Sequence, residues 1–321
     1  MRVQVESTGI YVPPLVETAT DLVDRVGKDE DWIVSRTGVL ARHVCREPVE
    51  AMAAKAARRA LGDGPEPDLI LNASATPRQA IPDTSVFVQQ ELGFDGIPSH
   101  TVHATCLSFT VALHTAAAFI HAGTYRRILI VSSEIGTVGR NFEEPESAVL
   151  LGDGAAAAVV VPTPAGSDSE LIAYRMTTHP RGAKLTEVPG GGVHQHPNRP
   201  EASALDNYFT MDGPGIYRMA RRRVAILLRD VLNQAGLADR DAIDLVVPHQ
   251  ASGMAVKAVS RYGFPPEKVV NVVAQYGNTI AASLPMALAH ANAEGRLQRG
   301  NRVLLVGTGA GLSVAAAILR W

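Results

Sequence analysis

The sequence predicts a layered α/β protein built from two related halves, and two observations lead to that prediction. Short apolar stretches of the kind that form buried strands alternate with Ala-rich helical patterns along all 321 residues. Each half also closes with the same succession of an Ala-rich helix, a basic turn, an apolar strand, a glycine turn and a second strand. The paired strands are 128–131 with 155–161, and 302–306 with 312–319. Such a repeat predicts that a βαβ-type unit has been duplicated. Each half would then be a mostly parallel sheet covered by helices.

A Pro/Ser-rich segment at 162–169 divides the chain near its middle. We therefore expect an N-terminal half over residues 1–165 and a C-terminal half over residues 166–321. A single Rossmann domain is the alternative, but no G-x-G-x-x-G follows the first strand. The turn Gly307-Thr308-Gly309 lies too near the C-terminus to open a nucleotide-binding unit.

In the N-terminal half, Cys106 stands at the head of an Ala-rich helical run that stops at Gly123. We place Cys106 in the first turn of this helix, where unpaired backbone N–H groups and the helix dipole favour a thiolate and lower its pKa. The alternative for a lone cysteine is a small apolar residue in a core. Before it, the periodicity predicts strands at 3–11 and 69–73 and helices at 49–61 and 85–92.

The C-terminal half contains a long irregular segment at 180–210, rich in Gly, Pro and His. A loop of that length in a compact domain is usually functional or mobile. Its His194 and His196 lack a third ligand at a convincing spacing, so we predict no metal site. The other elements predicted here are helices at 217–236, 254–262 and 280–293, and strands at 171–177, 243–247, 269–273, 302–306 and 312–319.

Composition and charge exclude several classes of protein. The formal net charge is -2, which provides no general attraction to nucleic acid or to a membrane surface. Cys45 and Cys106 are the only cysteines, which is no disulfide framework and fits a reducing compartment. No apolar run approaches the roughly 20 residues that span a bilayer, and no leader is visible. We expect a cytoplasmic protein.

Three polar residues follow predicted strands at the points where helices begin: Cys106, His249 and Asn278. In open α/β sheets, ligands bind beyond the carboxyl ends of the strands, so these three can converge on one site. Each also has a plain structural interpretation. A single histidine after a strand often serves as a hydrogen-bonding group, and an asparagine before a helix often serves as a cap.

Five motifs, in a fixed order, resemble a known family. They are Asp31-Trp32-Ile33-Val34-Ser35-Arg36-Thr37-Gly38, the Cys106 helix, Leu151-Gly152-Asp153-Gly154, Pro248-His249-Gln250-Ala251 and Gly277-Asn278-Thr279-Ile280-Ala281-Ala282-Ser283. Over nearly its whole length the chain resembles a β-ketoacyl-acyl-carrier-protein synthase III, a condensing enzyme of the thiolase fold. The resemblance implies a five-layered αβαβα sandwich and a homodimer.

The resemblance also implies roles for individual residues. Cys106 would accept an acyl group, and His249 and Asn278 would act on the extender, stabilising by hydrogen bonds the enolate that remains when CO2 leaves. The backbone N–H groups of Cys106 and Ala310 would form the oxyanion hole. The substrates would be thioesters of coenzyme A or of an acyl carrier protein, with no cofactor and no metal.

Contacts with the substrates and with the carrier protein follow from the same resemblance. Trp32 and Arg36 would hold the adenine of coenzyme A, and the segment 180–210 would line the acyl tunnel or its rim. Lys257 and Arg261 would meet the acidic carrier protein. The other implied substrate-binding residues are Ile81, Leu107, Phe109, Gly213 and Thr308.

Four departures from the family pattern bear on the substrate. Leu107-Ser108 stands where the family usually has a small residue and glycine, and Thr308 replaces a phenylalanine. Glu146 stands where a second adenine-binding arginine is expected. Ile81 takes the place of a phenylalanine that often reaches into the partner's acyl pocket, so longer or branched acyl chains could enter.

Three alternatives to decarboxylative condensation remain open at this point. The first is a specialised relative that transfers an acyl group to an oxygen or nitrogen nucleophile, or that joins two acyl chains. The second is a non-catalytic partner of another synthase. The third is a Cys-His-Asn hydrolase.

Overall fold

Two sheets with the same strand order form the centre of the computed structural model, which describes residues 1–321. The first sheet has the order β1-β7-β6-β4-β5, and the second has the order β8-β13-β12-β11 when read in the same direction. The four strands of the second sheet match β1, β7, β6 and β4 in order, and β5 has no counterpart. This correspondence confirms the two related halves expected from the repeated sequence pattern.

The strands of the first sheet are β1 (Val3–Tyr11), β4 (Leu69–Asn72), β5 (Ser99–Thr101), β6 (Ile128–Ile135) and β7 (Asp153–Pro162). Those of the second sheet are β8 (Glu170–Thr178), β11 (Leu245–Pro248), β12 (Arg302–Gly309) and β13 (Ser313–Arg320). Two separate two-stranded antiparallel sheets pair β2 (Leu15–Thr18) with β3 (Ala41–Val44), and β9 (Thr186–Glu187) with β10 (Thr210–Met211).

The expectation of mostly parallel sheets is confirmed for strand direction, with one exception in each sheet. β7 runs antiparallel to both β1 and β6, and β13 runs antiparallel to both β12 and β8. Parallel pairing is confined to β4 with β5 and β6, and to β11 with β12. Only residues 310–312 join β12 to β13. Such a short connection can only reverse the chain, because a parallel neighbour needs a crossover of a dozen or more residues.

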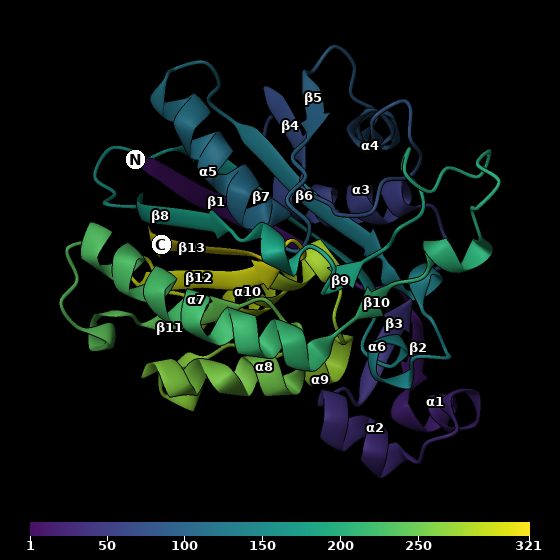
Figure 1. Cartoon of the computed structure of the whole chain (residues 1–321). Coiled ribbons are helices and arrows are strands. Elements are labelled where there is room, and N and C mark those ends of the chain that lie inside the picture. Colours follow the sequence, from purple (N-terminus) through teal and green to yellow (C-terminus); the bar gives the residue numbers. More distant parts are fainter.

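Helices form three layers around the two sheets, as the resemblance implied (Figure 1). α3 (Val49–Leu61) and α4 (Thr84–Leu92) cover the outer face of the first sheet. α5 (Ser108–His121) and α10 (Ser283–Ala293) contact strands of both sheets and lie between them. α7 (Gly213–Gln234) and α8 (Gly253–Ala258) lie on the outer side of the second sheet.

The strands separate these layers because their side chains alternate between the two faces. In β6, Ile128 and Ile130 belong to the central core, whereas Leu129 and Val131 pack with the outer helix α3. All four side chains are fully buried. Burial of each such side chain stabilises the fold by about 1.5–3 kcal/mol before entropy is counted. The helix predicted at 49–61 is confirmed with the same bounds.

The prediction of a strand at 269–273 is wrong. Val269 makes only an isolated parallel bridge with Val246, and the chain then enters the short helix α9 (Val273–Tyr276). The other short helical segments are η1 (Gly136–Gly139), η2 (Pro180–Gly182), η3 (Ala204–Asn207), η4 (Arg240–Ala242), η5 (Val259–Tyr262), η6 (Pro266–Lys268), η7 (Ile280–Ala282) and α6 (Pro145–Ala148).

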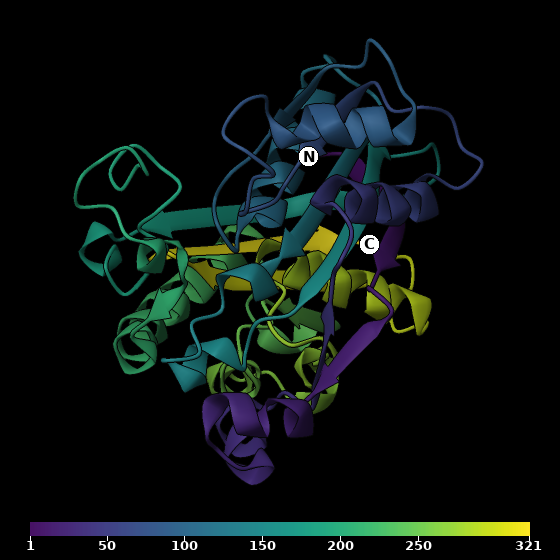
Figure 2. The same ribbon diagram turned by 90° about the vertical axis from the view of Figure 1, so that its right-hand side faces the viewer.

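Two excursions leave the layered body. α1 (Ala19–Val26) and α2 (Glu30–Thr37) form a small lobe at the bottom of both ribbon views, where α2 contacts α6 and α8. The segment 180–210 stands out from the body on the left of Figure 2. No helix of the structure combines the length and the apolar character needed to cross a membrane.

Candidate active site

Cys106 lies in a tight turn immediately before α5, not in the first turn of the helix as expected. α5 begins at Ser108, and Leu107 is its N-cap. Thr105 has a φ of 52°, which few residues other than glycine adopt. The Ser108 hydroxyl donates to the Thr105 carbonyl at 2.7 Å and accepts from the Ala104 N–H at 3.0 Å. The turn thus holds the cysteine between the first sheet and its helix.

The expected lowering of the Cys106 pKa is also wrong. Burial raises the pKa of this thiol to about 12, and the carboxyl group of Glu134 adds to the rise. Hydrogen bonding from the backbone N–H groups of Cys106 and Ala310 lowers the pKa by less. The resting cysteine is therefore a protonated thiol. The same two N–H groups are those that the resemblance assigns to the oxyanion hole.

His249 follows β11 directly and is 6% exposed. Its Nδ1 lies 2.5 Å from Oγ of Ser283, and that oxygen also accepts the backbone N–H of Gln250. The serine hydroxyl can therefore donate its hydrogen to Nδ1, and in that arrangement the ring proton is on Nε2. Burial lowers the pKa of His249 to about 4, so the imidazole is neutral at physiological pH.

Asn278 is held by backbone contacts from the N-terminal half. Its N–H donates to the Leu150 carbonyl at 2.8 Å, and its carbonyl accepts the N–H of Gly152 at 3.1 Å. Its side-chain Oδ1 accepts the N–H of Ile280 at 2.9 Å. This contact orients the carboxamide and leaves its NH2 group as a donor to other partners.

Two glycines make this clamp possible. A Cβ on Gly277, whose φ is 65°, would lie 2.7 Å from the Leu150 carbonyl oxygen. A Cβ on Gly152 would lie 2.4 Å from the carbonyl oxygen of Tyr276. The two motif loops therefore touch through bare backbone, which explains the glycine in Leu151-Gly152-Asp153-Gly154 and in Gly277-Asn278.

Gly277→Ala is expected to destabilise the fold by about 2–4 kcal/mol, because the left-handed φ costs about 1–2 kcal/mol and the backbone clash adds to it. Denaturant unfolding of the purified protein measures the change. Gly295→Ala is the matched control, since Gly295 has a φ of 71° and nothing within 4 Å of the added Cβ. Equal losses in the two variants would show that the contact with Leu150 is unimportant.

The end of β12 brings the cysteine turn next to His249. A Cβ on Gly307 would lie 3.0 Å from Cβ of His249 and 3.1 Å from Cδ2 of Leu107. A Cβ on Gly309 would lie 2.5 Å from Oγ1 of Thr105. The strand thus passes between the turn of the first half and the histidine of the second half. The bulk of Leu107 fits here because β12 carries no side chain at Gly307 and Gly309.

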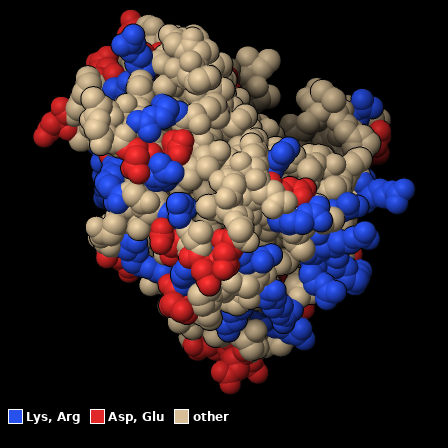
Figure 3. All heavy atoms as spheres, turned by 90° about the vertical axis from the view of Figure 1, so that its left-hand side faces the viewer, with Lys and Arg blue, Asp and Glu red and all other residues tan.

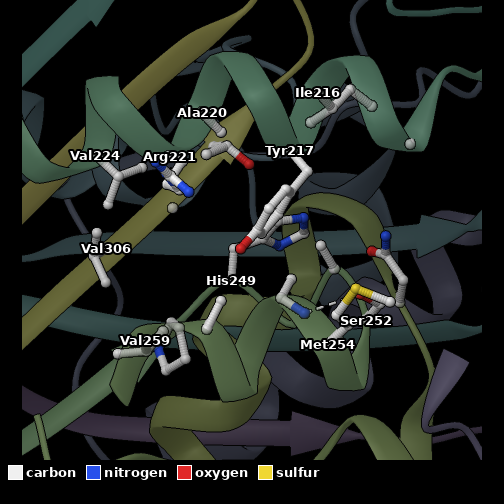
Figure 4. Close-up of a pocket in the computed structure, with 18 of the residues that line it drawn as sticks. Ile216, Tyr217, Ala220, Arg221, Val224, His249, Ser252, Met254, Val259 and Val306 are labelled. Atoms are coloured by element: carbon white, nitrogen blue, oxygen red, sulfur yellow. Dashed lines mark hydrogen bonds between the residues drawn. The ribbon is translucent and has the colours of Figure 1, made fainter. Parts of the chain in front are cut away.

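A cavity of about 420 Å3 opens between α7 and α8. His249 and Asn278 both line it, whereas Cys106 lies outside its lining. Figure 4 shows His249 in the middle of the cavity, with Tyr217 reaching down from α7 toward it. The volume is within the range of small-molecule sites in enzymes, about 300–1,000 Å3. His249 and Asn278 can therefore act on one substrate.

Comparison with known proteins decides the family. The family model described as "3-Oxoacyl-[acyl-carrier-protein (ACP)] synthase III" matches residues 101–180, and the model of the C-terminal part of the same family matches residues 232–321. The β-ketoacyl-[acyl-carrier-protein] synthase III of Desulfitobacterium hafniense is 36% identical over 329 residues, covering 100% of this chain and 98% of that protein. The chain belongs to the synthase III family.

Two further comparisons agree. The synthase III of Neisseria gonorrhoeae is 34% identical over 330 residues, which cover 99% of each chain. The crystal structure of the synthase III of Aquifex aeolicus has a TM-score of 0.90 and 32% identity, covering 99% of this chain and 100% of that one. These findings confirm the thiolase-like fold and a condensing function of the synthase III type.

Within this synthase III fold, the predicted substrate residues fall into two groups. Arg36, Gly213 and Thr308 line the cavity beside His249 and Asn278. The other four do not line it: Trp32 is half-buried with Lys28 over its ring, Leu107 and Phe109 are buried in the protein, and Ile81 is 84% exposed. No residue of 180–210 lines the cavity either. Substrate contacts at these positions stay predictions.

Basic side chains gather on the side of the molecule where α7 lies (Figure 3). Arg218, Arg221 and Arg222 of α7 are exposed, as are Lys257 and Arg261 across the cavity. Arg261 also donates a hydrogen bond to the Tyr217 hydroxyl, so it spans the gap between α7 and η5. Docking of a carrier protein at Lys257 and Arg261 stays a prediction.

Sequence reasoning missed two buried carboxyl groups that organise the site. Glu134 accepts hydrogen bonds from the backbone of Ala75 and Thr76 and lies near Cys106 and Ala281. Burial raises the pKa of Glu134 to about 7. Asp153 accepts the N–H groups of Cys45 and Thr137. An acidic residue in or beside an apolar strand was the available signal, because buried carboxylates need partners.

His194 and His196 lie on the exposed segment 180–210. The structure contains no group of three or more His, Cys, Asp or Glu side chains that could hold a metal ion.

The raised Cys106 pKa predicts the pH dependence of its alkylation. In a Cys45→Ser background, the rate with iodoacetamide should rise about tenfold per pH unit from about pH 7 to pH 9 without a plateau, because far below a pKa of about 12 the thiolate fraction grows in that proportion. Glu134→Gln removes a negative charge near the thiol, so alkylation should be faster at each pH. A plateau below about pH 8 in the parent protein would contradict the raised pKa.

Proposed function

We propose that this chain loads an acyl group from an acyl thioester onto Cys106 and condenses it with a malonyl group on an acyl carrier protein. The observation that carries the proposal is that His249 and Asn278 present neutral donors to one cavity. Ser283 occupies Nδ1 of His249 and Ile280 occupies Oδ1 of Asn278. Nε2–H and the carboxamide NH2 are left for the substrate. Donors of this kind stabilise an enolate oxygen.

In the first half-reaction, the Cys106 sulfur attacks the thioester carbonyl of the donor. The N–H groups of Cys106 and Ala310 stabilise the oxyanion, and the donor's carbon–sulfur bond then breaks. Because the resting thiol carries its proton, that proton leaves with the departing donor thiolate. The product is an acyl-enzyme and a free thiol, with no net change in protonation.

In the second half-reaction, the malonyl thioester loses CO2 and its electron pair remains as an enolate. The donors of His249 and Asn278 stabilise the enolate oxygen, and neither group needs to take a proton. The enolate carbon attacks the acyl carbonyl on Cys106, and the cysteine sulfur leaves and takes up a proton from water. The product is a 3-oxoacyl thioester on the carrier protein.

Assays with purified protein test the proposal. Intact-mass spectrometry with a panel of acyl-CoA donors should detect the acyl group on Cys106, and malonyl-carrier protein should then release CO2 and yield the 3-oxoacyl product. Acylation that is followed only by transfer to an alcohol or amine would overturn it in favour of the acyltransferase alternative. Acylation followed by release of the free acid would show a hydrolase, and no acylation with any donor would revive the non-catalytic partner.

Glu146 lies at the cavity mouth with Arg36, where the resemblance leads one to expect a second arginine. A carboxylate here would repel the phosphates of a coenzyme A nucleotide held by Arg36, so we infer that a carrier-protein thioester is a better acyl donor. Glu146→Arg is expected to raise kcat/KM for acyl-CoA by about tenfold, from the charge reversal at a partly exposed site. The acylation rates with acyl-CoA and with the same acyl group on pantetheine, which lacks the nucleotide, check this. An equal gain with both donors would contradict it.

We also infer a homodimer. β5 is an edge strand of the first sheet, and Ile81 and Val138 are exposed by 84% and 82%. An open strand edge and large exposed apolar side chains are each typical of a surface that a partner covers. Light scattering on the purified protein should give twice the mass of one chain, 34.0 kDa. A monomeric mass would contradict this inference.

A further inference from the structure

The cavity continues past His249 into the core of the C-terminal half. Its far end, here called the inner branch, is formed by Ala220, Val224, Leu228, Val259, Phe264 and Val306. Figure 4 shows Val224, Val259 and Val306 on one side of His249 and Met254 on the other. Except for Ala220, the side chains of the branch belong to the apolar core under α7, and none of them is more than 8% exposed.

This penetration of the core is unusual, because protein interiors normally close to a high packing density. The positions on α7 follow a helical spacing, with Ala220, Val224 and Leu228 on one face. Ala220 leaves space where a larger side chain on the same face would fill it. The branch is thus a shaped extension of the substrate cavity.

The six side chains that form the inner branch are all hydrocarbon. Arg221 follows Ala220 on α7 and also lines the cavity, but it is exposed to solvent. Tyr262 lies at its edge, but the Tyr262 hydroxyl donates to the Arg221 carbonyl at 3.2 Å. The Tyr217 hydroxyl accepts from the Arg261 guanidinium. A carboxylate or amide placed in the branch would lose its hydrogen bonds to water without replacement. An alkyl chain is the ligand that fits.

The position of the branch shows which substrate carries that chain. His249 and Asn278 line the cavity that leads into it, whereas Cys106 does not. A group on the nucleophilic carbon of the second substrate would start beside these two donors. A malonyl group has only hydrogen at that carbon, so it would leave the branch without a ligand group.

We propose that the inner branch binds an alkyl chain on the α-carbon of the second substrate, so that the enzyme joins two acyl chains into a branched product. This inference rests on the proposed function. A 2-alkylmalonyl thioester loses CO2, the electron pair stays on the substituted carbon as an enolate, and that carbon attacks the acyl carbonyl on Cys106. The cysteine sulfur leaves and takes a proton from water. The product is a 2-alkyl-3-oxoacyl thioester.

The test uses malonyl-, ethylmalonyl-, butylmalonyl- and hexylmalonyl-pantetheine with the pre-formed acyl-enzyme. In the unaltered protein, kcat/KM should rise with each added methylene, up to about fourfold per methylene, until the branch is full. Ala220→Phe should cut the butylmalonyl rate at least about tenfold relative to the malonyl rate.

Ala225→Phe is the matched control, because Ala225 lies on the exposed face of the same helix. It should leave the whole chain-length profile unchanged. Val224→Ala is a second variant that enlarges the branch, and it should move the preferred chain to a longer length. This variant keeps the proposal testable if Ala220→Phe fails to fold, which circular dichroism would reveal.

The failure of this inference can be distinguished from failure of the proposed function. Malonyl condensation that proceeds with no preference for alkylmalonyl thioesters would overturn the inference alone. The inference would also be overturned if Ala220→Phe changed which acyl donor acylates Cys106 fastest but left the preference among the malonyl thioesters intact. Loss of acylation with every donor concerns the proposed function. A faster reaction with butylmalonyl than with malonyl, sensitive to Ala220→Phe and insensitive to Ala225→Phe, supports the inference.

Discussion

Cys106→Ala is expected to abolish acylation of the protein and to lower condensation by at least about 1,000-fold, because it removes the thiol that we propose as the nucleophile, beside the backbone N–H groups of residues 106 and 310. The acyl-enzyme mass should disappear with every donor. Any residual reaction would come from binding the two thioesters near one another. Intact-mass spectrometry and CO2 release measure the two effects separately.

Cys45→Ser is the control for this experiment. Cys45 is half-buried, its thiol donates to the Glu47 carbonyl at 3.3 Å, and it does not line the cavity. Its replacement should leave acylation and condensation within about twofold. Persistent condensation in Cys106→Ala, or loss of it in Cys45→Ser, would show that the nucleophile has been misassigned.

His249→Ala is expected to separate the two half-reactions. Acylation of Cys106 should persist, because the donors for its oxyanion are backbone N–H groups. Condensation should fall by about 100- to 10,000-fold, the range that positioned hydrogen-bonding groups contribute in transition states. Single-turnover measurement of acyl-enzyme formation, followed by addition of the malonyl thioester, checks both statements.

Ser283→Ala provides a graded control for the histidine. It removes the hydroxyl that directs Nδ1 but keeps the imidazole, so condensation should fall less than in His249→Ala. The low pKa of His249, about 4, predicts that condensation by the acyl-enzyme loses no activity through this residue from about pH 8 down to about pH 5. A condensation rate that falls through an apparent pKa near 6.5 would contradict a neutral, buried His249.

The sequence alone was enough to predict the elements that depend on local pattern. The amphipathic spacing of residues 49–61 defines α3 to the residue, since the buried alanines face one sheet and Gly62 ends the helix. Ser252 directly precedes α8 and its hydroxyl accepts the N–H of Ala255, the capping role for which serine is favoured. The five motifs identified the family because each carries backbone or side-chain chemistry that few other residues could supply.

Local pattern failed where partners distant in the chain decide the outcome. Residues 269–273 have the composition of a strand, but only Val269 finds a strand to pair with. The βαβ pattern predicts strands of one direction, and β13 departs from it because the three-residue turn before it reverses the chain. Cys106 was expected to be acidic from its place near a helix, and its desolvation together with Glu134 reverses that direction.

By itself, the sequence determined the duplicated halves, the order of the motifs and the residue types that can form an acyl-enzyme and stabilise an enolate. These follow from periodicity and from side-chain chemistry, which are properties of the chain. The tertiary structure alone decided that bare glycine backbone clamps Asn278 to the other half, that the imidazole of His249 is buried, neutral and bonded to Ser283, and that the cavity extends into the core beneath α7. Each of these depends on how closely distant segments approach and on how far water is excluded, and neither quantity is encoded within any short stretch of sequence.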